Sequence, residues 1–230
     1  MGVVCRFTSI GAIQNLIATQ DDLTMYIPKI NLATDRDEIV SFMKQFSFAT
    51  IVTAKDSIPI ATHLPFLVSS NGEKIVLTSH FAKANEQWRD IENNDALVIF
   101  SEPHAYISPT HYEKELNVPT WNYISIHAYG KGKLITETES VFKVLEKTID
   151  NYENLYKQQW LRFPLDYRLK LVNGIVAFEI VVKDLQAKKK LSQNRTETER
   201  QKIIDTLSKS NDTSEQLIAA YMKKDQMADK

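Results

Sequence analysis

Six short segments rich in β-branched and aromatic residues, joined by residues that favour turns, most constrain the fold of this chain. They occupy residues 48–53, 60–68, 74–80, 96–101, 120–135 and 175–185. Lys55-Asp56-Ser57 supplies turn chemistry after the first segment, and Asn71-Gly72 is a strong two-residue turn signal before the third. Strands joined by such short links favour an antiparallel barrel over a doubly wound sheet. The sequence therefore predicts a mainly β fold with peripheral helices.

Helical spacing surrounds these strands. Thr34 and Asp37 resemble a capping box, and the apolar residues that follow predict a helix over residues 35–45. Apolar residues about four positions apart predict an amphipathic helix over residues 137–156. Beyond Glu197, two helices over residues 200–207 and 214–222 crudely resemble a helix-turn-helix. The second has few side chains of the kind that read base edges, so we expect the pair to cap the barrel, and direct DNA contact is the weaker interpretation.

Composition excludes several classes of protein. The formal net charge of −1 argues against avid, non-specific nucleic-acid binding, which depends on neutralising phosphates. Cys5 is the only cysteine, so no internal disulfide can form and a cytoplasmic location is the economical interpretation. No apolar run approaches the roughly 20 residues of a membrane-spanning helix. No G-x-G-x-x-G or Walker-type pattern occurs, which excludes a Gly-rich phosphate loop.

Regular patterning begins at Met25. We expect one folded domain over residues 25–195 and a helical extension over residues 196–230. Residues 1–24 make a poor signal peptide, because no continuous apolar stretch or small-residue cleavage site occurs there. We interpret them as either a misassigned start or a small appended helix.

Three histidines, His104, His111 and His127, raise the question of a metal site. Their spacing matches neither a helical i, i+4 pair nor a Cys/His finger, and no thiol is near them. We therefore expect no metal site. The residues from His104 onward, with the loop over residues 109–119, are expected to form a lid beside the mouth of the barrel.

Six motifs in order along the chain resemble those of the PaiB-type FMN-binding negative transcriptional regulators. They are MYIP at 25–28, PIATHLP at 59–65, HFAKANEQW at 80–88, HAYIS at 104–108, VPTWNY at 118–123 and KLSQNR at 190–195. Six ordered motifs are far more specific than any one of them. The resemblance covers nearly the whole chain from Met25 to about Arg200. It implies an antiparallel split β-barrel of the FMN-binding type, related to pyridoxamine-phosphate oxidases, with FMN bound at a homodimer interface.

Nine residues within or beside these motifs are predicted to hold the flavin. Ser79 and Lys83 precede a helix expected to open near Asn85, where hydroxyl, ammonium and free N–H groups suit a terminal phosphate. The resemblance to the strand-end phosphate site of wider split-barrel flavoproteins supports both residues. The full set is Thr62, His63, Ser79, Lys83, Trp121, Lys190, Ser192, Gln193 and Arg195. Lys188 and Lys189 are expected to face water, as a run of lysines usually does.

The sequence leaves alternatives open for these residues and for the function. Taken in isolation, Lys83 is typical of a solvated lysine and Ser79 of a cap, and a lone strand histidine such as His63 is usually structural. Trp121 could equally be a core or interface residue. The function could be that of a flavin-binding regulator or of a small FMN-dependent oxidoreductase, in which the cofactor carries the chemistry. A haem-binding split barrel with a histidine axial ligand is a weaker alternative.

Amphipathic aromatic residues also predict assembly. They are Trp88, Tyr106, Trp121, Tyr123 and Tyr129. This set is too large to fit comfortably inside one small barrel, and such residues are enriched in the cores of interfaces. We therefore expect a two-fold dimer with two equivalent flavin sites.

Overall fold

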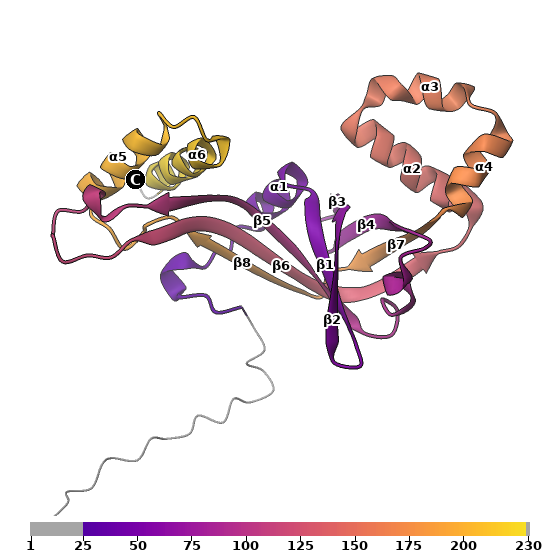
Figure 1. Cartoon of the computed structure of the whole chain (residues 1–230), viewed down its shortest axis with the longest axis horizontal. Helices are drawn as coiled ribbons and strands as arrows, with labels where there is room; N and C mark the ends of the chain where they lie inside the picture. Colours follow the sequence, from indigo (N-terminus) through magenta and orange to yellow (C-terminus); the bar gives the residue numbers. More distant parts are fainter. Residues whose placement is uncertain (1–24, 229–230) are drawn as a thin grey trace, which may run out of the picture.

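Eight antiparallel strands form one sheet in the computed structural model, which describes residues 25–228 (Figure 1). They are β1 (Phe48–Lys55), β2 (Ile58–Pro65), β3 (Leu67–Ser70), β4 (Ile75–Ala82), β5 (Asp95–Ile107), β6 (Thr120–Ile135), β7 (Ile175–Val181) and β8 (Asp184–Lys190). Their order is β2-β1-β5-β6-β7-β4-β3, and β8 also pairs with β6. The predicted split-barrel fold is confirmed, and its sheet is not closed. The leader predicted over residues 1–24 lies outside the described residues.

The long strand β6 divides the sheet into two halves. One edge of β6 pairs with β5, while the other pairs first with β8, over residues 123–129, and then with β7, over residues 132–135. Figure 1 shows β5 and β6 as a long curved ribbon, with β8 along one part of it and β7, β4 and β3 at the other end. Each strand alternates its side chains between two faces. Asn122, Ile124, Ile126 and Ala128 of β6 are buried, whereas Trp121, Tyr123, His127 and Tyr129 are exposed or half-buried.

The segment predicted as one strand over residues 60–68 is in fact two strands. Pro65 ends β2, and the backbone N–H of Phe66 donates to the Ser47 carbonyl at 2.8 Å, the last hydrogen bond in the β1–β2 register before the chain turns into β3. The Phe66 side chain is 1% exposed, so burial fixes the bend. The chain thereby passes from β2 at one end of the strand order to β3 at the other.

The segment predicted as one strand over residues 175–185 is likewise two strands, β7 and β8. Between them the backbone N–H of Val182 donates to the Ile75 carbonyl at 2.9 Å, and that of Lys183 donates to the Tyr129 carbonyl at 2.8 Å. These bonds redirect the chain from β4 toward β6. The prediction therefore missed a change of partner strand that no local pattern marks.

Aromatic residues form the centre of the core. The rings of Phe81 and Phe178 stack with centroids 4.9 Å apart, and Phe66 meets Phe178 edge to face at 6.2 Å. Phe81 and Phe178 are fully buried. Because these residues come from β4, β7 and the β2–β3 bend, the core joins both halves of the sheet.

Six α-helices surround the sheet of the described residues. They are α1 (Arg36–Gln45), α2 (Thr138–Tyr152), α3 (Lys157–Arg162), α4 (Leu165–Asn173), α5 (Glu197–Leu207) and α6 (Thr213–Ala228). The predicted helix over residues 35–45 is confirmed, but its cap is Asp35, which accepts from the Glu38 N–H at 3.0 Å, rather than Thr34. The helix predicted over residues 137–156 ends at Tyr152. A 3-10 turn and the short helices α3 and α4 follow it.

The C-terminal helices α5 and α6 cover the buried side of the sheet. Ile203 and Ile204 of α5 and Ile218 and Met222 of α6 are fully buried and belong to the main core. Figure 1 shows both helices packed over one end of the β5–β6 ribbon. The expectation that they cap the barrel is confirmed. None of the helices between residues 25 and 228 has the length and apolar character needed to cross a membrane.

Candidate functional site

The first group of predicted flavin ligands lies where β4 leads into a 3-10 helix, η3 (Glu86–Arg89). Asn85 caps η3: its Oδ1 accepts from the Gln87 N–H at 3.1 Å, and its Nδ2 donates to the Thr62 hydroxyl at 2.9 Å. The Thr62 hydroxyl donates to Gln87 Oε1 at 2.6 Å. Gln87 is buried, and its amide nitrogen donates to backbone carbonyls of β1 and β2. Thr62 therefore holds η3 against β2, and its hydroxyl is already engaged.

Ser79 and Lys83 differ in what they offer a ligand. Ser79 points into the core, is 3% exposed and donates its hydroxyl to the Pro65 carbonyl at 2.7 Å, which stabilises the β2–β3 bend. Lys83 is exposed, and its backbone N–H donates to the Gly174 carbonyl at 2.8 Å. No acceptor among residues 25–228 pairs with the Lys83 ammonium group. Lys83 is thus the cation of this group that is available to an anion.

Aromatic side chains gather on the outward face of β5 and β6. In the strand register Tyr106 lies opposite Trp121, and His104 lies opposite Tyr123. The ring centroid of Trp121 lies 5.8 Å from that of His104 and 5.8 Å from that of Tyr106. Trp121 is 52% exposed and Tyr106 is 47% exposed. We call this surface the open face; it comprises His104, Tyr106, Trp121, Tyr123, His127, Tyr129 and the paired Lys190.

His63 lies on the same side of the sheet. It pairs in register with Thr50 of β1, which pairs with Ile99 of β5, which pairs with His127 of β6. Paired residues of neighbouring strands share a face, so His63 marks the β2 edge of the open face. Its exposed ring stacks on Phe48 with centroids 6.3 Å apart. Burial lowers the pKa of His127, which favours its neutral form.

The second group of predicted ligands surrounds the turn after β8. Lys190 donates to the Thr120 hydroxyl, and burial lowers the pKa of its ammonium group. Ser192 has a φ of 59° and donates its hydroxyl to buried Asn122 at 3.1 Å. The Gln193 side chain closes the turn: its Oε1 accepts from the Leu191 N–H at 2.7 Å, and its Nε2 donates to the Lys189 carbonyl at 2.6 Å. Ser192 and Gln193 therefore shape the turn, while Lys190 lies beside the open face.

Arg195 anchors the loop predicted to act as a lid. Its guanidinium carbon lies 3.6 Å from the centroid of the Tyr112 ring, and its Nη1 donates to Asn117 Oδ1 at 2.9 Å. Tyr112 is buried beneath it. Both partners lie in the loop over residues 109–119, so Arg195 fixes that loop to the end of β8.

The prediction that Lys188 and Lys189 face water is wrong. Lys188 is 8% exposed and donates to the Tyr26 carbonyl at 3.0 Å. The Lys189 side chain is 17% exposed and forms ion pairs with Glu38 at 2.9 Å and Asp225 at 2.6 Å. Both lysines are covered because β8 lies between the N-terminal segment and helices α1 and α6. The alternation of a strand predicts opposite faces for two neighbouring lysines, and this signal was available in the sequence.

The two groups of predicted ligands lie far apart in one chain. Lys190 pairs with Tyr123 near the start of β6, whereas Lys83 follows β4, which reaches the end of β6 only through β7. An extended strand from position 123 to position 135 spans roughly 40 Å at about 3.3 Å per residue. Figure 1 places β4 and the end of β8 at opposite ends of the ribbon. Within one chain, the predicted ligands therefore form two separate groups. The first comprises Thr62, Ser79 and Lys83. The second comprises Trp121, Lys190, Ser192, Gln193 and Arg195.

Residues 25–184 match the family model described as "Putative FMN-binding domain". The chain is 40% identical over 201 residues to Protease synthase and sporulation protein PAI 2 of Bacillus subtilis (strain 168). The match covers 86% of this chain and 96% of that protein.

Solved structures show the same fold at low identity. The flavocytochrome Anf3 from Azotobacter vinelandii superposes with a TM-score of 0.54 at 16% identity, over 68% of each chain. The FAD and heme binding protein from Mycobacterium smegmatis superposes with a TM-score of 0.54 at 16% identity, over 70% of this chain and 73% of that one. With the family match, the close relative and this fold taken together, the chain belongs to the PaiB-type family of FMN-binding split-barrel proteins.

Proposed function

We propose that this chain is an FMN-binding regulatory protein that acts as a cytoplasmic homodimer, with each flavin held between two chains. The observation that carries the proposal is the separation of Lys83 from Trp121 and Lys190 within one chain. A mononucleotide is too short to bridge the two groups. In a two-fold dimer, the second group of one chain lies beside the first group of its partner, and the symmetry creates two equivalent sites.

The open face suits the dimer interface. Trp121 and Tyr106 are large aromatic side chains that are about half exposed, and they lie together on one side of a ribbon whose other side is buried. Contiguous exposed aromatic surface is typical of protein contact sites. Burial of this surface against a second copy accounts for the aromatic residues that the barrel interior does not hold.

The residues present fit FMN in their chemistry. The unpaired Lys83 ammonium suits the terminal phosphate, and the exposed rings of Trp121 and His63 offer flat surfaces to an isoalloxazine. Lys190, whose pKa is lowered by burial, places a cation beside those rings. Thr62, Ser79, Ser192, Gln193 and Arg195 hold the backbone and loops that carry these groups. FMN supplies redox chemistry when bound, and its binding to the dimer alone would couple flavin supply to assembly.

Lys83→Ala is expected to weaken FMN binding by about 1.5–3 kcal/mol, roughly 10- to 150-fold, because a charge-assisted bond to phosphate is lost. Quenching of FMN fluorescence in a titration measures the change. The matched control is Lys55→Ala, which removes an exposed lysine from the end of β1. Equal affinities for Lys83→Ala and the wild type would show that Lys83 is only a solvated lysine.

The absorbance spectrum of the purified protein distinguishes this proposal from its alternatives. We expect flavin bands and no Soret band, since a Soret band would identify a haem protein. Stopped-flow mixing of the FMN-loaded dimer with NADH tests the oxidoreductase alternative, because an enzyme bleaches its flavin at a catalytically useful rate. We place any regulatory output in assembly rather than in direct DNA contact, since α6 carries few side chains of the kind that read base edges.

A further inference from the structure

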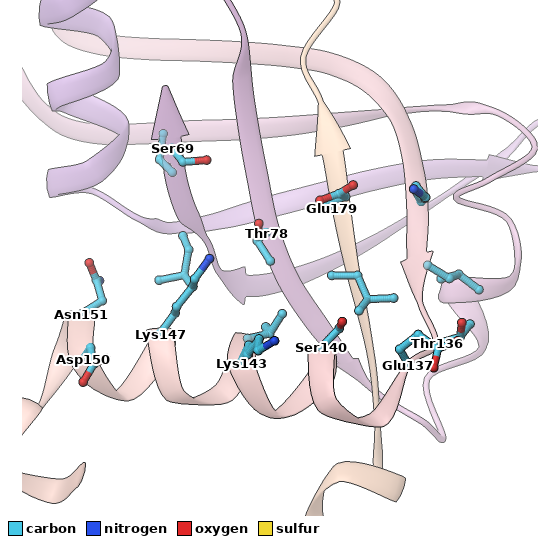
Figure 2. A pocket seen from close by; sticks show the side chains of 16 residues that line it. Ser69, Thr78, Thr136, Glu137, Ser140, Lys143, Lys147, Asp150, Asn151 and Glu179 are labelled. Atoms are coloured by element: carbon cyan, nitrogen blue, oxygen red, sulfur yellow. The ribbon is translucent and has the colours of Figure 1, made fainter. Parts of the chain in front are cut away.

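A groove of about 790 Å³ lies between α2 and the outer surface of β3, β4, β7 and β6 (Figure 2). Its volume falls within the range of small-molecule sites. None of the nine residues singled out as flavin ligands lines it. The groove therefore needs an explanation that is separate from the flavin.

Helix α2 forms one wall of this groove and is fixed at both ends. At its start, Val141 and Val144 are buried in a small cluster with Ala177 of β7. At its end, the hydroxyls of Tyr152 and Ser47 form a hydrogen bond of 2.6 Å. Between these anchors the helix crosses the strands, with polar side chains from both sides facing the space (Figure 2). The groove is thus framed by fixed elements.

Charged groups of both signs line the groove, and four of them have no side-chain hydrogen bond or ion pair among the described residues. Lys133, Lys147, Glu137 and Glu179 form no ion pair or hydrogen bond through their side chains with any residue between 25 and 228. Figure 2 shows Lys147 reaching from α2 toward Thr78 on the strands, where Glu179 also lies. Nearby charges do pair: Lys143 with Glu139 at 2.9 Å and Lys157 with Asp150 at 2.7 Å. Lys133 lies directly opposite Glu179 in the β6–β7 register, but their side chains form no ion pair, so both side chains are open to a ligand.

We propose that this groove binds a zwitterion of the amino-acid or short-peptide kind, with its carboxylate on Lys147 and its ammonium on Glu179. A ligand with charge of one sign only would meet repulsion from the other pair of groups, whereas a zwitterion satisfies both. Leu67, Ile135 and Val144 supply apolar surface for a side chain between the two charges. Free hydroxyls of Thr78 and Ser140 complete the polar lining.

The length of the groove limits the ligand. Its lining on α2 runs from position 137 to position 151, which is roughly 21 Å at about 1.5 Å per residue. An extended peptide rises about 3.3 Å per residue, so roughly six residues fit.

Calorimetry and thermal unfolding with defined probes test this inference. The probes are L-leucine, the dipeptide Leu-Ala, the tripeptide Leu-Ala-Ala, N-acetyl-Leu-Ala-amide and inorganic phosphate. We expect a probe with free termini to raise the Tm by about 3–6 °C at ten times its Kd, and the capped dipeptide to have no effect. Comparison of leucine with the peptides distinguishes a free amino acid from a peptide ligand.

Substitutions locate the binding. Lys147→Gln and Glu179→Gln should each weaken it about 10-fold or more, because each removes one charge-assisted bond. Lys131→Gln on β6 and Glu146→Gln on α2 lie outside the groove lining and should bind as the wild type does. FMN affinity, measured in parallel, should be unchanged in all four variants. These variants therefore test the zwitterion site independently of the flavin proposal.

Three results would overturn the zwitterion site. One is the absence of heat and of a Tm shift with every probe at millimolar concentration. A second is binding of phosphate or the capped dipeptide as strong as that of the free peptides. The third is binding that survives Lys147→Gln and Glu179→Gln in variants whose Tm and circular dichroism match those of the wild type.

Discussion

Trp121→Glu is expected to convert the proposed dimer into a monomer and to abolish high-affinity FMN binding. Trp121 lies on the open face in contact with His104 and Tyr106, and it is 52% exposed in the single chain. A carboxylate buried there loses its hydration, which costs several kcal/mol. The two-fold axis places the substitution in the interface twice. We expect the dimerisation constant to weaken by about 3 kcal/mol or more, at least roughly 100-fold. Sedimentation velocity at tens of micromolar protein, with and without FMN, measures the change.

Tyr167→Glu is the matched control for this experiment. Tyr167 is an aromatic residue of α4 with 47% exposure, and it lies outside the open face. The control variant should remain a dimer and bind FMN as the wild type does. The shared-site arrangement also requires FMN to strengthen the wild-type dimer. A Trp121→Glu protein that sediments as a dimer would contradict the proposed interface, and a dimer indifferent to saturating FMN would contradict the shared site.

Lys189→Met is expected to lower the free energy of unfolding at pH 7 by about 3 kcal/mol, the lower end of the range for breaking a buried ion pair. Lys189 joins β8 to Glu38 of α1 and Asp225 of α6, and all three side chains are 17% exposed. The substitution leaves two carboxylates close together with only Lys224, which is 64% exposed, to offset them. Urea denaturation measures the loss. Lys209→Met, at an exposed position after α5, is the control and should change stability by less than about 0.5 kcal/mol.

The loss from Lys189→Met should depend on pH in a definite direction. Burial by itself would raise the pKa of Glu38, but hydrogen bonds from Lys189 and Lys224 outweigh it and hold the pKa below its ordinary value. A carboxyl with a lowered pKa contributes stability that is complete above its unfolded pKa and disappears as pH falls through its folded pKa. The difference between wild type and variant should therefore be constant near neutrality and shrink below about pH 4. A difference that stays constant down to pH 3 would mean that Lys189 acts through packing alone.

Much of the fold could be predicted from the sequence because it depends on local patterns. The turn at Asn71-Gly72, where Gly72 has a φ of 85°, and the helix over residues 35–45 follow from neighbouring residues alone. Trp121, Tyr123 and Tyr129 of β6 are separated by even numbers of residues, so the alternation of a strand by itself puts them on one face. Even the displaced helix cap, Asp35 in place of Thr34, is an error of one position within the correct element.

Contacts between segments distant in the sequence decided the rest. Phe66 ends β2 because its side chain meets Phe178, more than 100 positions along the chain, and no local pattern records that contact. Lys188 and Lys189 resemble a solvated basic run until Tyr26, Glu38 and Asp225 surround them.

The candidate site follows the same division. The sequence by itself determined the residue types that suit a flavin, since lysine, hydroxyl and aromatic side chains have their chemistry wherever they lie. Only the tertiary structure decided which of them are free to use it: the hydroxyls of Thr62 and Ser79 are engaged within the fold, while the ammonium of Lys83 is not. It also decided that β6 separates Lys83 from Lys190, because strand register is set by pairing between strands and not by the residues of any one strand.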